Sequence, residues 1–285
     1  MKRHKFFKEE VSSDVICGNE IWIHRLQEAK NGCNICIVLA NGCTASCVSK
    51  GSKYILGGRD VPDISMFRID AEILAVYYLP TCRGLAAGSQ ELAEFLNFNS
   101  TNKEVWLIGH SKWADGLNDI SNQLKEFKSD YASLDVVFVS PALGGSVFAN
   151  EKLFKEHPKR CKLFMNVARM IGFKANRVEL DVDPESEYIK QHSKVVKKPT
   201  KCYVTCLRQR NNLSLREKMY RIKDLEGLFN VLLDWAMYGG TDGIVSVSSQ
   251  TRNVFLSRVK RIYSPHCHGL EAGCRELVKD FDHLS

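Results

Sequence analysis

The sequence predicts an α/β protein with a mainly parallel sheet and helices on both faces. Short apolar segments alternate with amphipathic segments through the first half of the chain, and several apolar segments are unbroken runs. An unbroken run indicates a strand buried on both faces, which is typical of parallel sheets, and the alternation indicates helices that connect the strands. With 285 residues and 44% hydrophobic content the chain can bury one large core, so we expect a single domain over residues 1–285.

The elements can be placed in chain order. Two short β-rich runs around the turn pair Gly18-Asn19 predict a hairpin that opens the sheet. A segment with Pro, Gly and Arg, residues 79–88, predicts a break before an amphipathic helix in which Leu92, Phe95 and Leu96 share one face. We expect strands at 15–17, 21–24, 35–39, 72–78, 105–108, 136–139, 201–207 and 258–263. We expect helices at 89–98, at 114–127 and from 225 to the Gly239-Gly240 stop, and a final helix that ends at about residue 283.

The alternation is lost at about residues 150–200. This region follows the loop sequence SPALGGSVFAN, contains Pro158, which should interrupt a helix, and ends in a charged stretch. We interpret it as a cap or lid inserted into the domain. A solvated insertion without function is the alternative.

Composition restricts partners and location. The net charge of +7 gathers at the N-terminus and between Lys190 and Lys223, without aromatic residues interleaved with the basic ones, so we expect no nucleic-acid partner. No apolar window is long enough for a transmembrane helix, and the first ten residues lack the apolar run of a signal peptide. We therefore expect a cytoplasmic protein. Eleven cysteines, an odd number in largely strand-like contexts, indicate reduced thiols.

Four of these cysteines, Cys33, Cys36, Cys43 and Cys47, have spacings that a zinc site could use. Cys33 and Cys36 would project from different faces of an extended segment, which disfavours a shared ion. We interpret them as packing residues and expect no metal and no cofactor.

The segment from Val105 to Gly116, VWLIGHSKWADG, carries the main functional signal because it runs from a strand through Gly109-His110-Ser111 into a helix. A nucleophilic serine needs such a sharp strand-to-helix turn, so that its hydroxyl projects from the backbone and the next N–H faces the reacting carbonyl. An ordinary turn in which Ser111 caps the helix is the alternative.

Two later features complete a catalytic order. Asp242 lies in the glycine-flanked turn TDG, and His266 and His268 follow the last predicted strand. Each also has a simpler interpretation, because Asp is a common turn residue and a histidine can cap a helix. From about Ile35 to the C-terminus the chain resembles the α/β-hydrolases of the serine lipase and esterase kind, in the order Ser, Asp, His, in the GHSK turn and in the segments SPALGGS and TDGIVSVSSQ.

The resemblance implies a serine ester hydrolase that acts on an acyl or lipid ester through an acyl-enzyme, with transient contact to a membrane surface compatible with such a substrate. Ser111 would be the nucleophile, Asp242 the acid, and His266 or His268 the base. The oxyanion would be held by the backbone of Lys112 and Cys43, beside Gly42, and the substrate pocket would include Asn41, His110 and Trp113.

Trp113 departs from the GxSxG pattern, which has a second glycine at this place. An outward indole would wall the acyl pocket, whereas an inward indole would push the helix away and displace Ser111 by about an ångström, which costs about a hundredfold in rate. The second functional hypothesis follows from this residue: a catalytically impaired, hydrolase-like binding protein.

Overall fold

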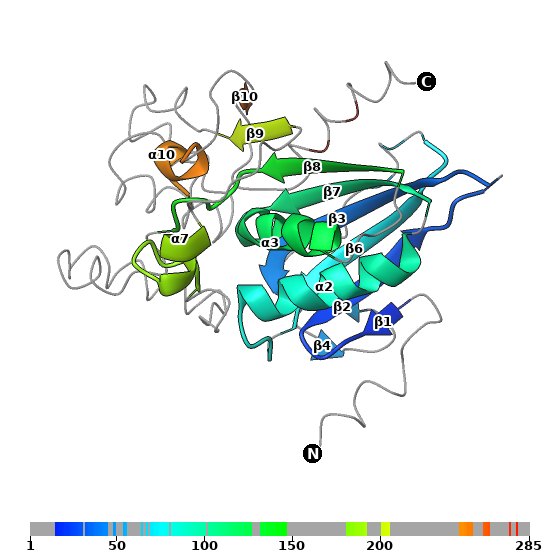
Figure 1. Cartoon of the computed structure of the whole chain (residues 1–285), viewed down its shortest axis with the longest axis horizontal. Coiled ribbons are helices and arrows are strands. Elements are labelled where there is room, and N and C mark those ends of the chain that lie inside the picture. Colours follow the sequence, from blue (N-terminus) through cyan, green and yellow to red (C-terminus); the bar gives the residue numbers. More distant parts are fainter. Residues whose placement is uncertain are drawn as a thin grey trace.

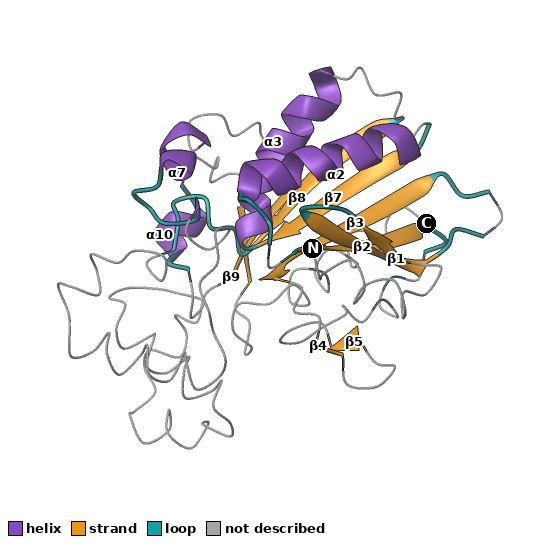
Figure 2. Cartoon of the chain, turned by 90° about the horizontal axis from the view of Figure 1, so that it is seen from below, coloured by secondary structure: helices purple, strands orange, loops and turns teal. Residues whose placement is uncertain are grey.

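The computed structural model of the chain contains a large sheet, a separate two-stranded sheet, and the helices and loops beside them (Figures 1 and 2). The structure describes residues 15–30, 32–44, 48–49, 54–55, 64, 67, 69–79, 81–100, 102–126, 132–146, 181–192, 201–205, 245–252, 259–262, 274 and 278.

The sheet has eight strands in the order β1-β2-β6-β3-β7-β8-β9-β10. The first two strands form the predicted antiparallel hairpin, and β2 is also antiparallel to β6. Every other pair in the sheet is parallel, which confirms the mainly parallel sheet. The strands are β1 Val15–Cys17, β2 Ile21–Gln27, β3 Ile35–Thr44, β6 Glu72–Tyr78, β7 Glu104–His110, β8 Ser133–Val139, β9 Lys201–Thr205 and β10 Val259–Ile262, and a separate pair is formed by β4 Val48–Ser49 and β5 Tyr54–Ile55.

The run ICIVL is the centre of the sheet, as its unbroken apolar character predicts. It lies between β6 and β7, and Ile37, Val38 and Leu39 have no exposed surface. The strand continues past the predicted end at Leu39, but its pairing with β7 stops at Ala40, opposite Gly109. Its register with β6 shifts between Ala40 and Thr44, so residues 41–43 leave the ladder at its carboxyl end.

Two helices cover one face of the sheet, α2 Leu85–Asn99 and α3 Lys112–Glu126 (Figure 2). The prediction of a break through residue 88 was wrong, since α2 begins four residues before the expected Ser89. Its first turn is capped from a distant segment: the carboxylate of Asp181 accepts a hydrogen bond of 2.8 Å from the N–H of Leu85. A negative group at a helix N-terminus is stabilising, and here no acidic residue of the first turn supplies it.

The second face of the sheet has its own core cluster, which includes Ile37, Leu39, Ile73 and Ile108. Cys274 and Val278, both helical and four residues apart, pack against this cluster. Helical residues therefore lie on both faces, as the alternation of elements predicts.

The described part of the predicted insertion, residues 181–192, contains the short helix α7 Glu187–His192. It packs against the body of the domain: Val182, Tyr188 and Ile189 belong to the core cluster under α2 and α3. The Tyr188 hydroxyl donates a 2.8 Å hydrogen bond to Asp119 of α3. The remainder of the insertion lies outside the described residues, so its role as a lid stays a prediction.

One side chain of α2 holds the β1-β2 hairpin, at the edge of the sheet, against the rest of the fold. The carboxylate of Glu91 accepts hydrogen bonds from the backbone N–H groups of Asn19 (2.7 Å), Glu20 (2.6 Å) and Ile21 (2.9 Å). These groups lie at the turn between β1 and β2, where the strand ladder provides no partner for them. The hairpin thus depends on a helix residue some 70 positions away in sequence.

Replacement of Glu91 by Ala should lower the free energy of unfolding by about 3 kcal/mol. Three backbone N–H groups lose their charged acceptor, and two of these hydrogen bonds are partly buried. Urea denaturation followed by circular dichroism measures the loss. Glu94→Ala, on the same helix with an exposed hydrogen bond to Gln90, is the matched control and should change stability by less than about 0.5 kcal/mol. Equal stability of both variants would contradict the proposed role of Glu91.

Candidate functional site

Ser111 occupies the turn between β7 and α3 with φ of 58°, in the left-handed region that non-glycine residues rarely adopt. Its N–H donates to the carbonyl of Val139 at the end of β8 (3.0 Å), and its carbonyl accepts from Ala142 (3.3 Å) and Ala114 (3.1 Å). The strained conformation is therefore held from β8, from the loop after β8 and from the helix. Such strain persists only where the surroundings fix it, and it is concentrated at functional sites.

Two glycines let neighbouring elements approach this turn. A Cβ atom at Gly42 would lie 2.5 Å from the Cβ of Ser111 and 2.9 Å from the carbonyl oxygen of His110, closer than real atoms pack. A Cβ at Gly109 would lie 2.6 Å from a methyl carbon of Leu117 in α3. The end of β3 thus touches the serine, and α3 packs directly on β7, because both positions lack a side chain.

Three of the predicted site residues besides Ser111 and Gly42 lie at the same place. Asn41 and His110 are buried, and Nδ1 of His110 would be 3.2 Å from a Cβ at Gly42. Lys112 is the first residue of α3 and is also buried, with its ammonium nitrogen 5.7 Å from the centre of the Tyr78 ring. The positive end of the helix dipole therefore lies next to Ser111.

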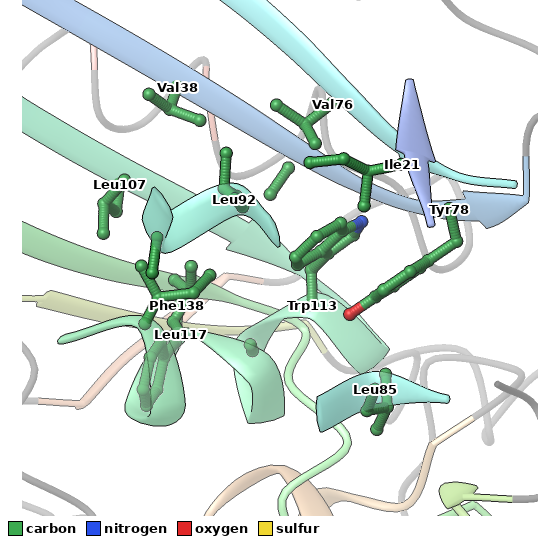
Figure 3. Close-up of a cluster of buried hydrophobic side chains, with 14 of the residues drawn as sticks. Ile21, Val38, Val76, Tyr78, Leu85, Leu92, Leu107, Trp113, Leu117 and Phe138 are labelled. Carbon is green, nitrogen blue, oxygen red and sulfur yellow. The ribbon is translucent and has the colours of Figure 1, made fainter. Parts of the chain in front are cut away.

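Trp113 takes the inward of the two orientations that the sequence leaves open. Its indole has no exposed surface and stacks on the ring of Tyr78, with ring centres 3.9 Å apart and an interplanar angle of 11°. Figure 3 shows the two rings among apolar side chains that include Ile21, Val76 and Leu92. The indole belongs to the core between the sheet and the helices, so it does not wall an open acyl pocket in this structure.

Small residues provide the volume for this ring pair. A Cβ at Gly88 of α2 would lie 2.5 Å from Cε1 of Tyr78, and one at Gly116 of α3 would lie 2.6 Å from the Ser89 hydroxyl oxygen and 3.5 Å from the indole. The extra volume of Trp113 is therefore accommodated between the helices, and Ser111 retains its left-handed turn. Burial raises the pKa of Tyr78 well above its ordinary value, which keeps its phenol neutral.

The remaining predicted site residues are described in part or not at all. Cys43 lies in β3, beside Gly42, and only its backbone is described. Asp242, His266 and His268 lie outside the described residues.

Of the four cysteines whose spacing a zinc site could use, Cys36 has the packing role expected of it. Cys36 is buried in the core, and burial raises the pKa of its thiol to about 12, which disfavours the thiolate that zinc requires. Cys33 is half-buried, and Cys47 lies outside the described residues. Within the described ranges, no three His, Cys, Asp or Glu side chains form a group suited to a metal ion, and no helix there is long and apolar enough to span a membrane.

Sequence reasoning missed two contributors to this region. Tyr78 is the last residue of β6, and its inward direction follows from strand alternation, but its partner Trp113 comes from another element. Ala142, whose N–H contacts the Ser111 carbonyl, acts through its backbone, and a backbone contact leaves no signal in the sequence.

Known structures share this arrangement of strands. The mature form of the Bacillus licheniformis lipase BlEst2 is similar over 94% of this chain and 99% of its own, with a TM-score of 0.56 and 13% sequence identity. Its propeptide form is similar over 94% of this chain and 54% of its own, with a TM-score of 0.50 and 12% identity. No protein-family profile and no curated protein matches the sequence. The chain therefore has the α/β-hydrolase fold.

Replacing Trp113 by Gly should lower the free energy of unfolding by about 4 kcal/mol, because it empties the space of a fully buried ring and puts glycine into a helix. Trp113→Phe keeps an aromatic ring on Tyr78 and should lose less than half as much. Urea denaturation compares the two. A Trp113→Gly protein as stable as the wild type would mean that the indole is not a core residue.

Proposed function

We propose that the protein is a serine ester hydrolase that cleaves an acyl or lipid ester, with Ser111 as the nucleophile. The observation that carries the proposal is the left-handed backbone of Ser111 at the junction of β7 and α3. A nucleophile elbow requires this conformation, because it projects the hydroxyl away from the chain. A serine that only capped the helix would have no need of a positive φ.

The surroundings of Ser111 support an oxyanion site. The N-terminus of α3 begins at Lys112, and the close approach of Gly42 puts the end of β3 against the serine. In the proposed reaction the hydroxyl oxygen attacks the ester carbonyl, and the negative charge develops on the carbonyl oxygen. The backbone N–H groups of Lys112 and Cys43 would hold that oxygen, with each such donor worth about 3 kcal/mol in the transition state.

The neighbouring described residues support Asp242 as the acid. Val245, three residues later, is buried, and the short helix α10 Val247–Gln250 follows it. Three residues span at most about 10 Å, so the carboxylate is tethered near Val245. Ser249 of this helix contacts Gly144 in the loop after β8, the loop that also contacts Ser111. These contacts put α10 at the edge of the sheet where Ser111 lies, which supports the proposal that the nearby Asp242 is the acid.

The direction of the last strands supports the two histidines as candidates for the base. β10 is parallel to β9, which is parallel to β8, so β10 ends at the edge where β7 delivers Ser111. His266 follows the end of β10 by four residues, a reach of about 14 Å, and His268 by six, a reach of about 21 Å. One of them would take the Ser111 proton and pass it to the leaving alcohol, while Asp242 orients the imidazole and stabilises the imidazolium. Water then hydrolyses the acyl-enzyme.

The inward packing of Trp113 bears on the alternative of an impaired binding protein. The suspected cause of impairment was displacement of the serine, yet Ser111 keeps the left-handed turn with the indole in place. We therefore prefer the active hydrolase, with an ester as the substrate. The cytoplasmic location expected from the sequence remains part of the proposal.

A fluorophosphonate probe should label the wild-type protein, because it reacts with serines that an adjacent base activates. Labelling is measured by intact mass and by peptide mapping to Ser111. Ser111→Ala should abolish it, and Ser140→Ala, at the other described serine with a positive φ, should retain it. A folded wild-type protein that stays unlabelled from neutral to mildly alkaline pH would refute the hydrolase and leave the binding protein.

Asp242→Asn should lower kcat for a short p-nitrophenyl ester about 10⁴-fold, because the amide stabilises the wrong tautomer of the histidine. The amide is nearly isosteric and tolerates turns, so the melting temperature should change little. The control is Asp183→Asn, at a described and partly exposed turn residue, which should leave kcat unchanged. Near-normal turnover by Asp242→Asn, with a dead Ser111→Ala protein, would mean that another residue is the acid.

A further inference from the structure

A continuous path of hydrogen bonds leads from Ser111 to the side chain of Ser249. The Ser111 carbonyl accepts from the N–H of Ala142 (3.3 Å), and the Ala142 carbonyl accepts from the N–H of Gly145 (2.6 Å). The Gly145 carbonyl then accepts from the Ser249 hydroxyl (2.6 Å). Every other group on this path belongs to the backbone, so Ser249 supplies its only side chain.

Ser249 makes a second contact with the loop after β8. Its hydroxyl oxygen accepts from the N–H of Gly144 (3.0 Å), which also lies 3.1 Å from the Ser249 carbonyl oxygen. Both side-chain hydrogen bonds are buried, and a Cβ at Gly144 would lie 3.0 Å from the Cα of Ser249. The hydroxyl thus donates to Gly145 and accepts from the preceding residue, Gly144, which fixes α10 in one register on the loop.

The other side of the loop after β8 is held by residues 182–184. Gly145 has φ of +83°, and a Cβ there would lie 2.6 Å from the backbone nitrogen of Pro184. Ser146 donates a 2.7 Å hydrogen bond to the carbonyl of Val182. In Figure 1, α7 and α10 lie at the end of the sheet toward which β7, β8 and β9 point. The loop is therefore held between α10 and residues 182–184, at the edge that carries Ser111.

The geometry points to Ser249 as a positioning residue for the serine turn. Its hydroxyl fixes residues 142–145, and through Ala142 these residues hold the carbonyl of Ser111 while Val139 holds its N–H. The same hydroxyl anchors the helix that begins five residues after Asp242. Ser249 thereby sets the relative position of the two segments that the proposed reaction needs to meet. This inference rests on the proposed hydrolase for its catalytic consequence and on the hydrogen bonds alone for its structural one.

The structural consequence is tested by amide hydrogen exchange in the intact protein. Ser249→Ala should speed exchange at the amides of Ala142, Gly144 and Gly145 by at least tenfold, because the buried anchor of their loop is lost. The amides of β3 and β7 serve as an internal reference and should be unchanged, which separates local loosening from global unfolding. Ser248→Ala, the same change at the exposed neighbour in α10, should leave all these rates unchanged. Unchanged loop exchange in Ser249→Ala would overturn the inference whether or not the protein is an enzyme.

The catalytic consequence is tested by the kinetics of fluorophosphonate labelling. In Ser249→Ala the maximal labelling rate should fall about tenfold while the half-saturating probe concentration stays within twofold, since the serine is misplaced but the probe still binds. Ser249→Thr keeps the hydroxyl and should label at nearly the wild-type rate. A Ser249→Ala protein with loosened exchange and an unchanged labelling rate would overturn the positioning role. If the wild type is not labelled at all, the proposed function fails, and the exchange experiment alone decides the inference.

Discussion

The left-handed backbone at Ser111 is the constraint around which the carboxyl edge of this sheet is built. Three hydrogen bonds hold it, one from its own N–H to β8 and two to its carbonyl from the loop after β8 and from α3. Each of these partners depends on correct neighbouring packing: β8 on its parallel pairing with β7, α3 on its contact with Gly109, and the loop on α10. A single unfavourable φ is therefore stabilised by several separate parts of the chain.

The packing of Trp113 shows how a departure from a sequence pattern can leave the backbone unchanged. The second elbow glycine normally gives space for helix and sheet to approach. Here the space lies elsewhere, at Gly88 and Gly116, and the indole fills it together with Tyr78. Complementary volume, more than the identity of one position, is what close packing requires.

Local patterns in the sequence predicted much of the sheet. Glu72–Tyr78 was predicted with its observed bounds, and the central position of ICIVL follows from its unbroken apolar run. The start of α2 was missed because Gly88 resembles a breaker locally, although it serves as the contact surface for Tyr78. The grouping of Ser111 with Gly42 was implied by the resemblance to α/β-hydrolases, whereas the contacts of Ala142 and Ser249 depend on loop backbone that no residue pattern encodes. Asp242 and the two histidines rest on chain order, and their roles stay predictions.

The position of β3 in the sheet has a consequence for how the chain assembles as it is synthesised. Both of its neighbours, β6 and β7, come later in the sequence, so the ribosome releases the apolar run of residues 35–40 well before either partner exists. Until residue 78 emerges, a segment that is buried on both faces in the finished protein has no strand to pair with. Exposed apolar strands of this kind are what molecular chaperones bind and what nascent chains aggregate through. The central strand that presents Gly42 to Ser111 is thus also a part of the protein that needs protection during translation.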